Sequence, residues 1–254
     1  MADISINLHN TIHNIDGLEL LKQIPDHSID LILTDPPYIT SRESGMNKLY
    51  ESGTTQDQTY GRKYAIKTDY GDWDKNFTLE QLDNFIKEYH RVLKPQGTCI
   101  IFFDLWKLTN LADLMTNHNF KQLRFIEWIK TNPMPINAKV NYLTNAREIA
   151  ITAVKEKKPT FNSEQDNGIY EYPFYSQKDR FHPTQKSIKL FENLIIKHSN
   201  EDDIVLDTFL GSGTTVMASV STGRRYIGSE LDETFFKGME KRIEGLGGLG
   251  DFLV

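Results

Sequence analysis

Short apolar segments alternate with segments of helical pattern along most of the 254-residue chain, and this alternation constrains the fold more than any other feature. In the last third, the apolar run IVLD (204–207) precedes a loop at 208–213, a helix at 214–222, a strand at 225–230 and a helix from Asp232 onward. Earlier strands are predicted at 28–34, 98–103, 120–130 and 148–154, and helices at 18–24, 78–93, 109–118 and 184–198. Strands alternating with helices form a largely parallel sheet covered on both faces. The sequence therefore predicts an α/β fold with a doubly wound, mostly parallel sheet.

The composition is that of a globular protein, with 39% hydrophobic and 25% charged residues and a formal net charge of −6. No apolar run approaches the roughly 18 residues of a membrane span, and MADISINLHN lacks the pattern of a signal peptide. The single cysteine, Cys99, excludes an intramolecular disulfide framework and a cysteine-rich zinc site. We therefore expect a cytoplasmic protein with no membrane partner and no metal site.

The strand predicted at 28–34 ends in an unusual corner, Asp35-Pro36-Pro37-Tyr38. Consecutive prolines remove two backbone donors and fix two φ angles, and they favour an extended conformation for Asp35. The next stretch, 39–70, is rich in Ser, Thr, Gly, Gln, Lys and Tyr and fits no regular element. A loop of this length in a compact domain is usually a lid, a binding loop or disordered, and because it directly follows the corner we predict a mobile loop over the active site.

A glycine-rich loop, DTFLGSGTT (207–215), connects a predicted strand to a predicted helix. Gly211 and Gly213 let the backbone approach a ligand closely at the start of the helix. Glu230 stands nineteen residues after Gly211, at the end of the next strand. From such a position a carboxylate accepts hydrogen bonds from ribose hydroxyls in nucleotide-binding sheets.

The loop lacks the lysine of an ATP-binding P-loop, and Val216 occupies the third glycine position of a dinucleotide fingerprint. A nucleoside ligand without a pyrophosphate remains, because Asp207 can pair with a cationic amino group where it would repel phosphates. S-adenosylmethionine fits this description, since it carries an amino acid and a ribose but no phosphate.

Beside such a ligand, the proline corner suits methyl transfer to an exocyclic amine of a nucleobase. The Asp35 carboxylate and the Pro36 carbonyl could accept both N–H groups and stabilise the charge that develops on nitrogen. Tyr38 could stack on a base that has been flipped out of a duplex. Methylation at cytosine C5 would need an exposed cysteine nucleophile, and Cys99 lies inside the apolar run TCIIFF.

The charge is unevenly distributed along the chain. Residues 120–160 contain eight Lys or Arg against three Asp or Glu, whereas 200–254 contain five against ten. Such asymmetry can mark a basic face for phosphates on an acidic protein. Together with the polar, aromatic stretch 155–181, the basic segment is the candidate for DNA contact and sequence reading.

The motifs resemble those of the β-class S-adenosylmethionine-dependent DNA amino-methyltransferases, which form N6-methyladenine or N4-methylcytosine. DPPY (35–38) resembles the catalytic motif, DTFLGSGTT (207–215) the cofactor motif, and HPTQK (182–186) the motif around the methionine end of the cofactor. The catalytic motif precedes the cofactor motif, which is the permuted β-class order. GDWD (71–74) and KTNP (130–133) are similar to segments of bacterial adenine methyltransferases of restriction systems.

The resemblance implies a circularly permuted, Rossmann-like methyltransferase fold in one catalytic domain, 1–254, with an inserted recognition region at about 130–181. It implies S-adenosylmethionine as cofactor, S-adenosylhomocysteine as product and no metal. The catalytic residues would be Asp35, Pro36, Pro37 and Tyr38. The cofactor would be bound by Asp16, Asp35, His182, Thr184, Lys186, Asp207, Phe209, Gly211, Ser212, Gly213, Thr214 and Glu230. Within this set, Asp16 would meet the adenine, Glu230 the ribose, and His182 and Lys186 the carboxylate end.

DPPY is more usual in adenine than in cytosine methyltransferases, so N6-adenine in DNA is the expected target. N4-cytosine in DNA and adenine in RNA are the alternatives for the same chemistry. A nicotinamide-dependent oxidoreductase or a non-catalytic DNA-binding module would leave the DPPY corner unexplained. The resemblance is compatible with a homodimer and with a restriction endonuclease partner, in a bacterium or encoded by a phage.

Overall fold

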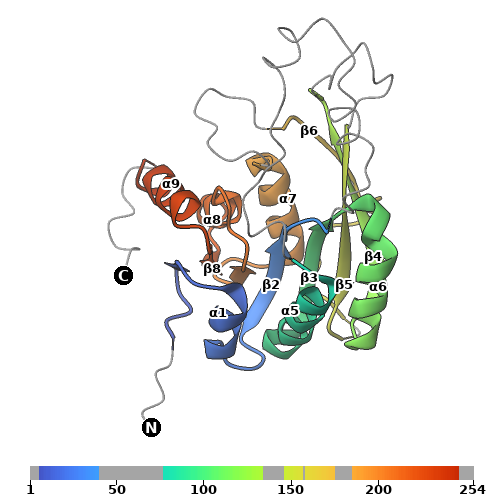
Figure 1. Ribbon diagram of the computed structural model, residues 1–254. Helices are drawn as coiled ribbons and strands as arrows, with labels where there is room; N and C mark the ends of the chain where they lie inside the picture. The colour runs from blue at the N-terminus through green and yellow to red at the C-terminus, as the bar shows by residue number, and fades with distance from the viewer. Residues whose placement is uncertain (1–5, 40–76, 134–145, 157, 175–184, 246–254) are drawn as a thin grey trace, which may run out of the picture.

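A single eight-stranded sheet forms the centre of the computed structural model, which describes residues 6–39, 77–133, 146–156, 158–174 and 185–245 (Figure 1). The strands are β1 (Thr11–His13), β2 (Ile29–Thr34), β3 (Leu93–Phe103), β4 (Lys121–Lys130), β5 (Arg147–Val154), β6 (Ile169–Tyr172), β7 (Ile204–Asp207) and β8 (Arg225–Ser229). Among the described residues, the α-helices are α1 (Gly17–Gln23), α5 (Leu79–Val92), α6 (Leu108–Asn117), α7 (Ile188–His198), α8 (Thr214–Ser221) and α9 (Glu233–Glu244). A 3-10 turn, η1 (Leu105–Lys107), precedes α6.

The strand order is β1-β8-β7-β2-β3-β5-β4-β6, and the sheet is mostly parallel. Only β5, within this sheet, runs antiparallel to its neighbours β3 and β4. The connection through α5 leads from β2 outward to β3, whereas the connection through α8 leads from β7 outward to β8 in the opposite direction. The chain therefore switches direction between β2 and β7. In doubly wound sheets, ligands bind outside the carboxyl ends of the strands at such a switch point.

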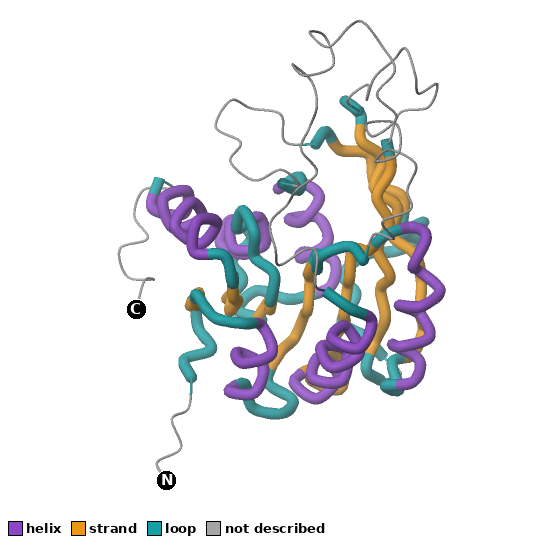
Figure 2. The backbone as a smooth tube through the Cα atoms, viewed as in Figure 1, coloured by secondary structure: helices purple, strands orange, loops and turns teal. Residues whose placement is uncertain are grey.

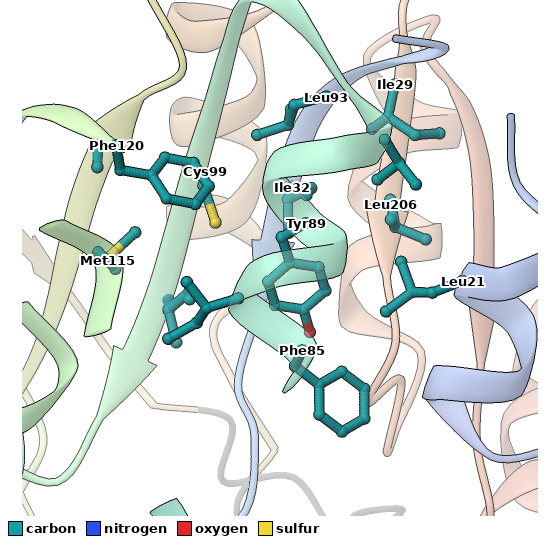
Figure 3. Packing of buried hydrophobic residues seen from close by; sticks show 14 of the residues in the cluster. Leu21, Ile29, Ile32, Phe85, Tyr89, Leu93, Cys99, Met115, Phe120 and Leu206 are labelled. Carbon is teal, nitrogen blue, oxygen red and sulfur yellow. The ribbon is translucent and has the colours of Figure 1, made fainter. Parts of the chain in front are cut away.

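Helices cover both faces of the sheet, as Figure 2 shows. Alternate residues of β2 and β3 point to opposite faces, as the strand period of two requires. Ile32 and Cys99 face the layer of α1, α5 and α6, whereas Leu33 and Phe102 face the layer of α7 and α8. Figure 3 shows part of the first layer, where Tyr89 of α5 packs between the sheet and its neighbouring helices.

The sequence predicted most of these elements, and α5 begins as expected. Thr78 caps the helix by accepting the backbone N–H of Gln81 at 3.2 Å, and the Gln81 side chain accepts the Thr78 N–H at 2.9 Å. This reciprocal pair is a capping box, which satisfies two backbone donors that the helix leaves free. Cys99 is fully buried, as its apolar surroundings predicted.

Several predicted boundaries were wrong, and two strands were missed. The helix expected at 184–198 begins at Ile188, because Ser187 is its extended N-cap residue. The strand expected at 98–103 begins at Leu93. Strands β1 and β6 were not predicted, since three and four residues at opposite edges of the sheet give too short a pattern. Most of the loop predicted at 39–70, and parts of the 130–181 region, lie outside the described residues.

No helix in the described part of the chain is both long enough and apolar enough to cross a bilayer.

Candidate active site

The DPPY corner lies at the carboxyl end of β2, beside the switch point. Pro36 and Pro37 are buried, which fixes the backbone that carries their carbonyl groups. The Tyr38 ring packs edge-on against Phe103 at the end of β3, with ring centroids 6.1 Å apart. The corner is therefore held rigidly between the ends of two central strands.

Two polar atoms of this corner lack hydrogen-bond partners within the described structure, although both are buried. They are the Asp35 Oδ1 atom and the Tyr38 hydroxyl oxygen. Burial raises the pKa of Tyr38 well above its ordinary value, and the neighbouring Asp35 charge raises it further. A hydrogen-bonding interaction with Asp35 also raises the pKa of Tyr38, so the two side chains are close to each other. Buried polar atoms are almost always hydrogen-bonded in native proteins, which makes this corner a candidate site for a ligand that supplies the missing partners.

The other Asp35 oxygen is bound to a lysine. The Lys186 ammonium group donates to Asp35 Oδ2 and lies 2.9 Å from Glu148 Oε2. Glu148 Oε1 in turn lies 2.6 Å from the Lys130 ammonium group. Four side chains of alternating charge, from β4, β5, the corner after β2 and the segment before α7, thus form one continuous row.

Burial and the neighbouring charges shift the pKa values of these side chains in opposite directions. Burial raises the pKa of Asp35 to about 6, and Lys186 opposes that rise. Burial also favours neutral Glu148, but Lys186 and Lys130 outweigh it and lower the pKa of Glu148. For Lys186, the two carboxylates outweigh the effect of burial and raise its pKa. Lys186 thus favours the charged form of both carboxylates that it contacts, and both carboxylates favour the charged form of Lys186.

A second network surrounds Asp207, the last residue of β7. Its Oδ1 atom accepts the Thr34 hydroxyl at 2.7 Å and the Phe209 backbone N–H at 3.0 Å, and its Oδ2 atom accepts the Thr215 hydroxyl at 2.6 Å. Burial raises the pKa of Asp207 despite these donors, which lower it. The carboxylate thus links the end of β2 to the first turn of α8.

The glycine loop adopts the backbone that its sequence predicts. Gly211 and Gly213 have φ values of +51° and +76°, in the left-handed region that favours glycine. The Gly211 N–H donates to Glu230 Oε2 at 2.7 Å, and the Asp232 N–H donates to Glu230 Oε1 at 2.8 Å. Burial raises the pKa of Glu230. Glu230 therefore lies directly against the glycine loop, as the nucleotide-binding pattern requires.

Helix α1 brings Asp16 to the same end of the sheet. Asp16 caps α1 by accepting the Leu18 N–H at 2.8 Å. A methyl group added at Gly17 would lie 2.9 Å from Thr208 Cβ, so the start of α1 packs closely on the glycine loop. The Phe209 ring packs against Phe85 of α5, with centroids 4.8 Å apart.

Most of the predicted site residues therefore converge on the carboxyl edge of β2 and β7. Ser212 and Thr214 are also buried there, with their hydroxyl oxygens 3.1 Å apart. His182 and Thr184 lie outside the described residues and stay predictions. Lys186 was expected at the carboxylate end of the cofactor, and the structure places its ammonium group on Asp35.

Sequence reasoning missed Glu148, Lys130, Thr34 and Thr215 as members of the site. A charged residue that opens an otherwise apolar strand, as Glu148 opens EIAITAV, was the available signal. It could not be interpreted without the direction of β5. Across the described ranges, no group of three or more His, Cys, Asp or Glu residues is arranged to hold a metal ion.

Comparison with known proteins identifies relatives along nearly the whole chain. The model of a DNA methylase family of the N6 and N4 type matches residues 29–241. The type II methyltransferase M2.LlaDCHI of Lactococcus lactis subsp. cremoris is 31% identical over 247 residues, covering 90% of this chain and 87% of its own. The type II methyltransferase M.HinfI of Haemophilus influenzae is 31% identical over 257 residues, covering 92% of this chain and 68% of its own.

Solved structures agree with this result. The M1.HpyAVI–SAM complex is 30% identical, has a TM-score of 0.65, and is matched over 91% of this chain and 98% of its own. The cytosine-N4-specific PvuII DNA methyltransferase, at 19% identity and a TM-score of 0.70 over 92% of this chain and 86% of its own, shares the fold. With its proline corner and glycine loop at the switch point of a doubly wound sheet, the chain belongs to this family of N6- and N4-type DNA methylases.

Proposed function

We propose that this protein transfers a methyl group from S-adenosylmethionine to the exocyclic N6 amine of a flipped-out adenine in DNA. The observation that carries the proposal is the buried Asp35 Oδ1 atom, an acceptor without a hydrogen-bond partner among the described residues. It lies at the carboxyl end of β2, next to β7, the strand that leads into the glycine loop. A substrate amine would supply the missing donor.

The loop suits S-adenosylmethionine better than a nucleotide with phosphates. Two acidic side chains, Asp207 and Glu230, contact the loop backbone, and the loop has no lysine. Burial already disfavours their negative charge, and a pyrophosphate beside them would disfavour it further. When bound, S-adenosylmethionine supplies a methyl group on a positively charged sulfur. The acidic loop is compatible with that charge, and the solved relative M1.HpyAVI was crystallised as a complex with the same cofactor.

The residues of this chain would bind the cofactor in three places. Asp16 at the start of α1 would meet the adenine, and Glu230 would accept the ribose hydroxyls. Asp207, Phe209, Gly211, Ser212, Gly213 and Thr214 would line the sugar and methionine region. His182 and Thr184 would act at the methionine end.

At the reacting amine, Asp35 Oδ1 and the Pro36 carbonyl would each accept one N–H. These contacts orient the nitrogen lone pair toward the methyl group and stabilise the positive charge that develops on nitrogen. The rigid proline backbone keeps both acceptors in place without reorganisation. Tyr38 would stack on the flipped base and offset part of the cost of unstacking it.

Adenine is proposed over cytosine because the Asp35-Pro-Pro-Tyr38 motif is more usual in adenine methyltransferases. DNA is proposed over RNA as the substrate, with residues within 130–181 reading its sequence. The protein would act in the cytoplasm, in a bacterium or during phage infection. A homodimer and an endonuclease partner remain compatible with this proposal.

The test uses unmethylated plasmid DNA and tritiated S-adenosylmethionine with wild-type protein and the Asp35→Ala variant. Digestion of the product to nucleosides should yield N6-methyladenine, and the variant should lose at least about a hundredfold in rate. Asp113→Ala, at an exposed position on α6, is the control and should retain activity. N4-methylcytosine would refute the target base, transfer preferentially to matched RNA would refute the substrate, and an active Asp35→Ala variant would refute the mechanism.

A further inference from the structure

We propose that Lys186 and Glu148 are positioning residues for Asp35: Lys186 fixes one carboxylate oxygen, Glu148 fixes Lys186, and Asp35 Oδ1 is thereby presented to the target amine. This inference rests on the proposed function, because it assigns Asp35 as the acceptor of that amine. It also gives Lys186 a different task from binding the carboxylate of the cofactor.

The topology of the sheet brings these side chains together. Strand β5 is antiparallel to β3, so its first residues lie at the edge where the parallel strands end. Glu148 is paired with Trp128 of β4, two residues before Lys130. Alternation along each strand places Asp35, Glu148 and Lys130 on the face covered by α7, because Leu33, Ala150 and Trp128 belong to that core layer.

Lys186 is closely enclosed where it meets the two carboxylates. Its side chain is only 6% exposed, and its ammonium nitrogen lies 5.7 Å from the Tyr38 ring centroid and 5.8 Å from that of Phe102. The ammonium group therefore contacts one aromatic ring of the corner and one of the core while it binds Asp35 and Glu148. A lysine enclosed in this way has little freedom to leave Asp35.

The two carboxylate oxygens of Asp35 therefore have different roles. Oδ2 is occupied by Lys186, and Oδ1 is buried without a partner among the described residues. A carboxylate that could rotate would present either oxygen, or a protonated one, to the amine. Fixing one oxygen removes that freedom before the substrate arrives, and such preorganisation is a large contribution to catalysis.

The charges around Asp35 predict how each partner affects its ionisation. Lys186 lowers the pKa of Asp35, whereas Glu148 and Asp207 raise it. Among the described residues, Tyr38 also lies at the corner and stays neutral because burial raises its pKa, and the nearby Asp104 charge raises that pKa further. Lys130 is paired with Glu148. Removing the positive partner and removing the negative partner should therefore shift the titration of Asp35 in opposite directions.

The experiment compares Lys186→Met and Glu148→Gln with wild-type protein. The rate kcat/KM for unmethylated plasmid DNA is measured against pH at saturating S-adenosylmethionine. In Lys186→Met, the acid limb of the profile should shift to higher pH by about 1–3 units, because Asp35 loses an adjacent opposite charge and its pKa rises. From a pKa of about 6, a rise of about two units would lower the ionised fraction of Asp35, and the rate, about tenfold at pH 7, with recovery at higher pH.

In Glu148→Gln, the acid limb should shift to lower pH, because removing a negative charge near Asp35 lowers the pKa of Asp35. Glutamine has the volume of glutamate, and its one amide oxygen can still accept from Lys186, so the variant keeps that contact while it loses the negative charge and the acceptor for Lys130. Lys186→Arg keeps the positive charge and should return the acid limb toward its wild-type position. Lys189→Met, three residues along the chain and paired with Glu192 at the surface, is the lysine control and should leave the profile unchanged.

Binding of S-adenosylmethionine, measured by calorimetry, separates the two tasks considered for Lys186. If Lys186 serves Asp35, the Lys186→Met variant should bind the cofactor within about threefold of wild type while its pH profile shifts. A large loss of cofactor affinity with an unshifted acid limb would overturn the proposal. Lower activity in both variants without opposite shifts of the limb would also overturn it, since that result indicates a role in folding alone.

The Asp35→Ala variant distinguishes failure of this proposal from failure of the proposed function. If Asp35→Ala is inactive but the pH profiles of the Lys186 and Glu148 variants do not shift, the positioning role is refuted and Asp35 remains the proposed acceptor of the amine. If Asp35→Ala retains activity, the proposed function fails at its central residue and the positioning role fails with it.

Discussion

Replacing Thr34 with valine tests whether the buried Asp207 carboxylate holds β2 and the glycine loop together. Valine has nearly the same shape as threonine, so the change removes the hydroxyl donor with little loss of packing. Thr34 is fully buried, and its hydroxyl donates to Asp207 Oδ1 at 2.7 Å. A hydrogen bond to a charged group contributes about 1.5–3 kcal/mol, so the free energy of unfolding should fall by that amount near pH 8. For a chain of this size, the corresponding fall in Tm is about 3–12 °C.

The destabilisation should depend on pH, because it depends on the charge of Asp207. Burial raises the pKa of Asp207 in the folded state. For such a group, the favourable contribution to stability is fully present below the unfolded pKa and is lost as pH rises through the folded pKa. Below that pKa the carboxyl is neutral, and the bond from Thr34 is worth about 0.5–1.5 kcal/mol. The difference in unfolding free energy between wild type and Thr34→Val should therefore grow as pH rises.

Chemical denaturation of both proteins at several pH values, followed by circular dichroism, measures this difference. Thr116→Val is the matched control, since the Thr116 hydroxyl donates at 2.8 Å to the Ala112 carbonyl at an exposed site on α6. It should lower stability by at most about 0.5 kcal/mol at every pH. The reasoning is refuted if Thr34→Val costs no more than this control near pH 8, or if its cost does not change with pH.

Three further changes test other parts of the site. Gly213→Ala places a methyl group 2.6 Å from Met239 Cγ at a φ of +76°, so it should cost about 1–3 kcal/mol and weaken binding of S-adenosylmethionine; unchanged affinity in calorimetry would contradict this. Tyr89→Phe removes the 2.5 Å hydrogen bond to the Thr208 hydroxyl and should lower the unfolding free energy by about 1–2 kcal/mol in urea denaturation, a result that an unchanged midpoint would exclude. Burial raises the pKa of Cys99, so its thiol should react with iodoacetamide only as fast as the protein unfolds; rapid labelling of the native protein would refute that assignment.

The parts of the fold that were predictable are those in which neighbouring residues along the chain determine the structure. Thr78 and Gln81 form the expected capping box because both partners lie in one turn of helix. The glycine loop and the proline corner were also local: their dihedral angles follow from glycine and proline themselves. Glu230 was found through a fixed spacing within one strand–helix–strand unit.

The parts that were missed depend on pairing between distant segments. β1 and β6 gain their strand conformation from β8 and β4, their partners in the sheet, and three or four residues show no distinct periodicity. Glu148 was correctly placed at the start of a strand, but the sequence does not show that the strand runs antiparallel. That direction alone brings Glu148 within 2.9 Å of Lys186, 38 positions later in the sequence.

The antiparallel direction of β5 also determines where the chain can vary in length. Because β4 ends and β5 begins at the edge that carries Asp35, the connection 131–146 leaves and re-enters the sheet there. The connection from β2 to α5 and the one from β6 to α7 start at the same edge. Insertions in these connections, outside the proline corner and Lys186, would leave the register of the paired strands unchanged. Variation in the length of the chain at this edge would therefore leave the strand pairings of the sheet the same.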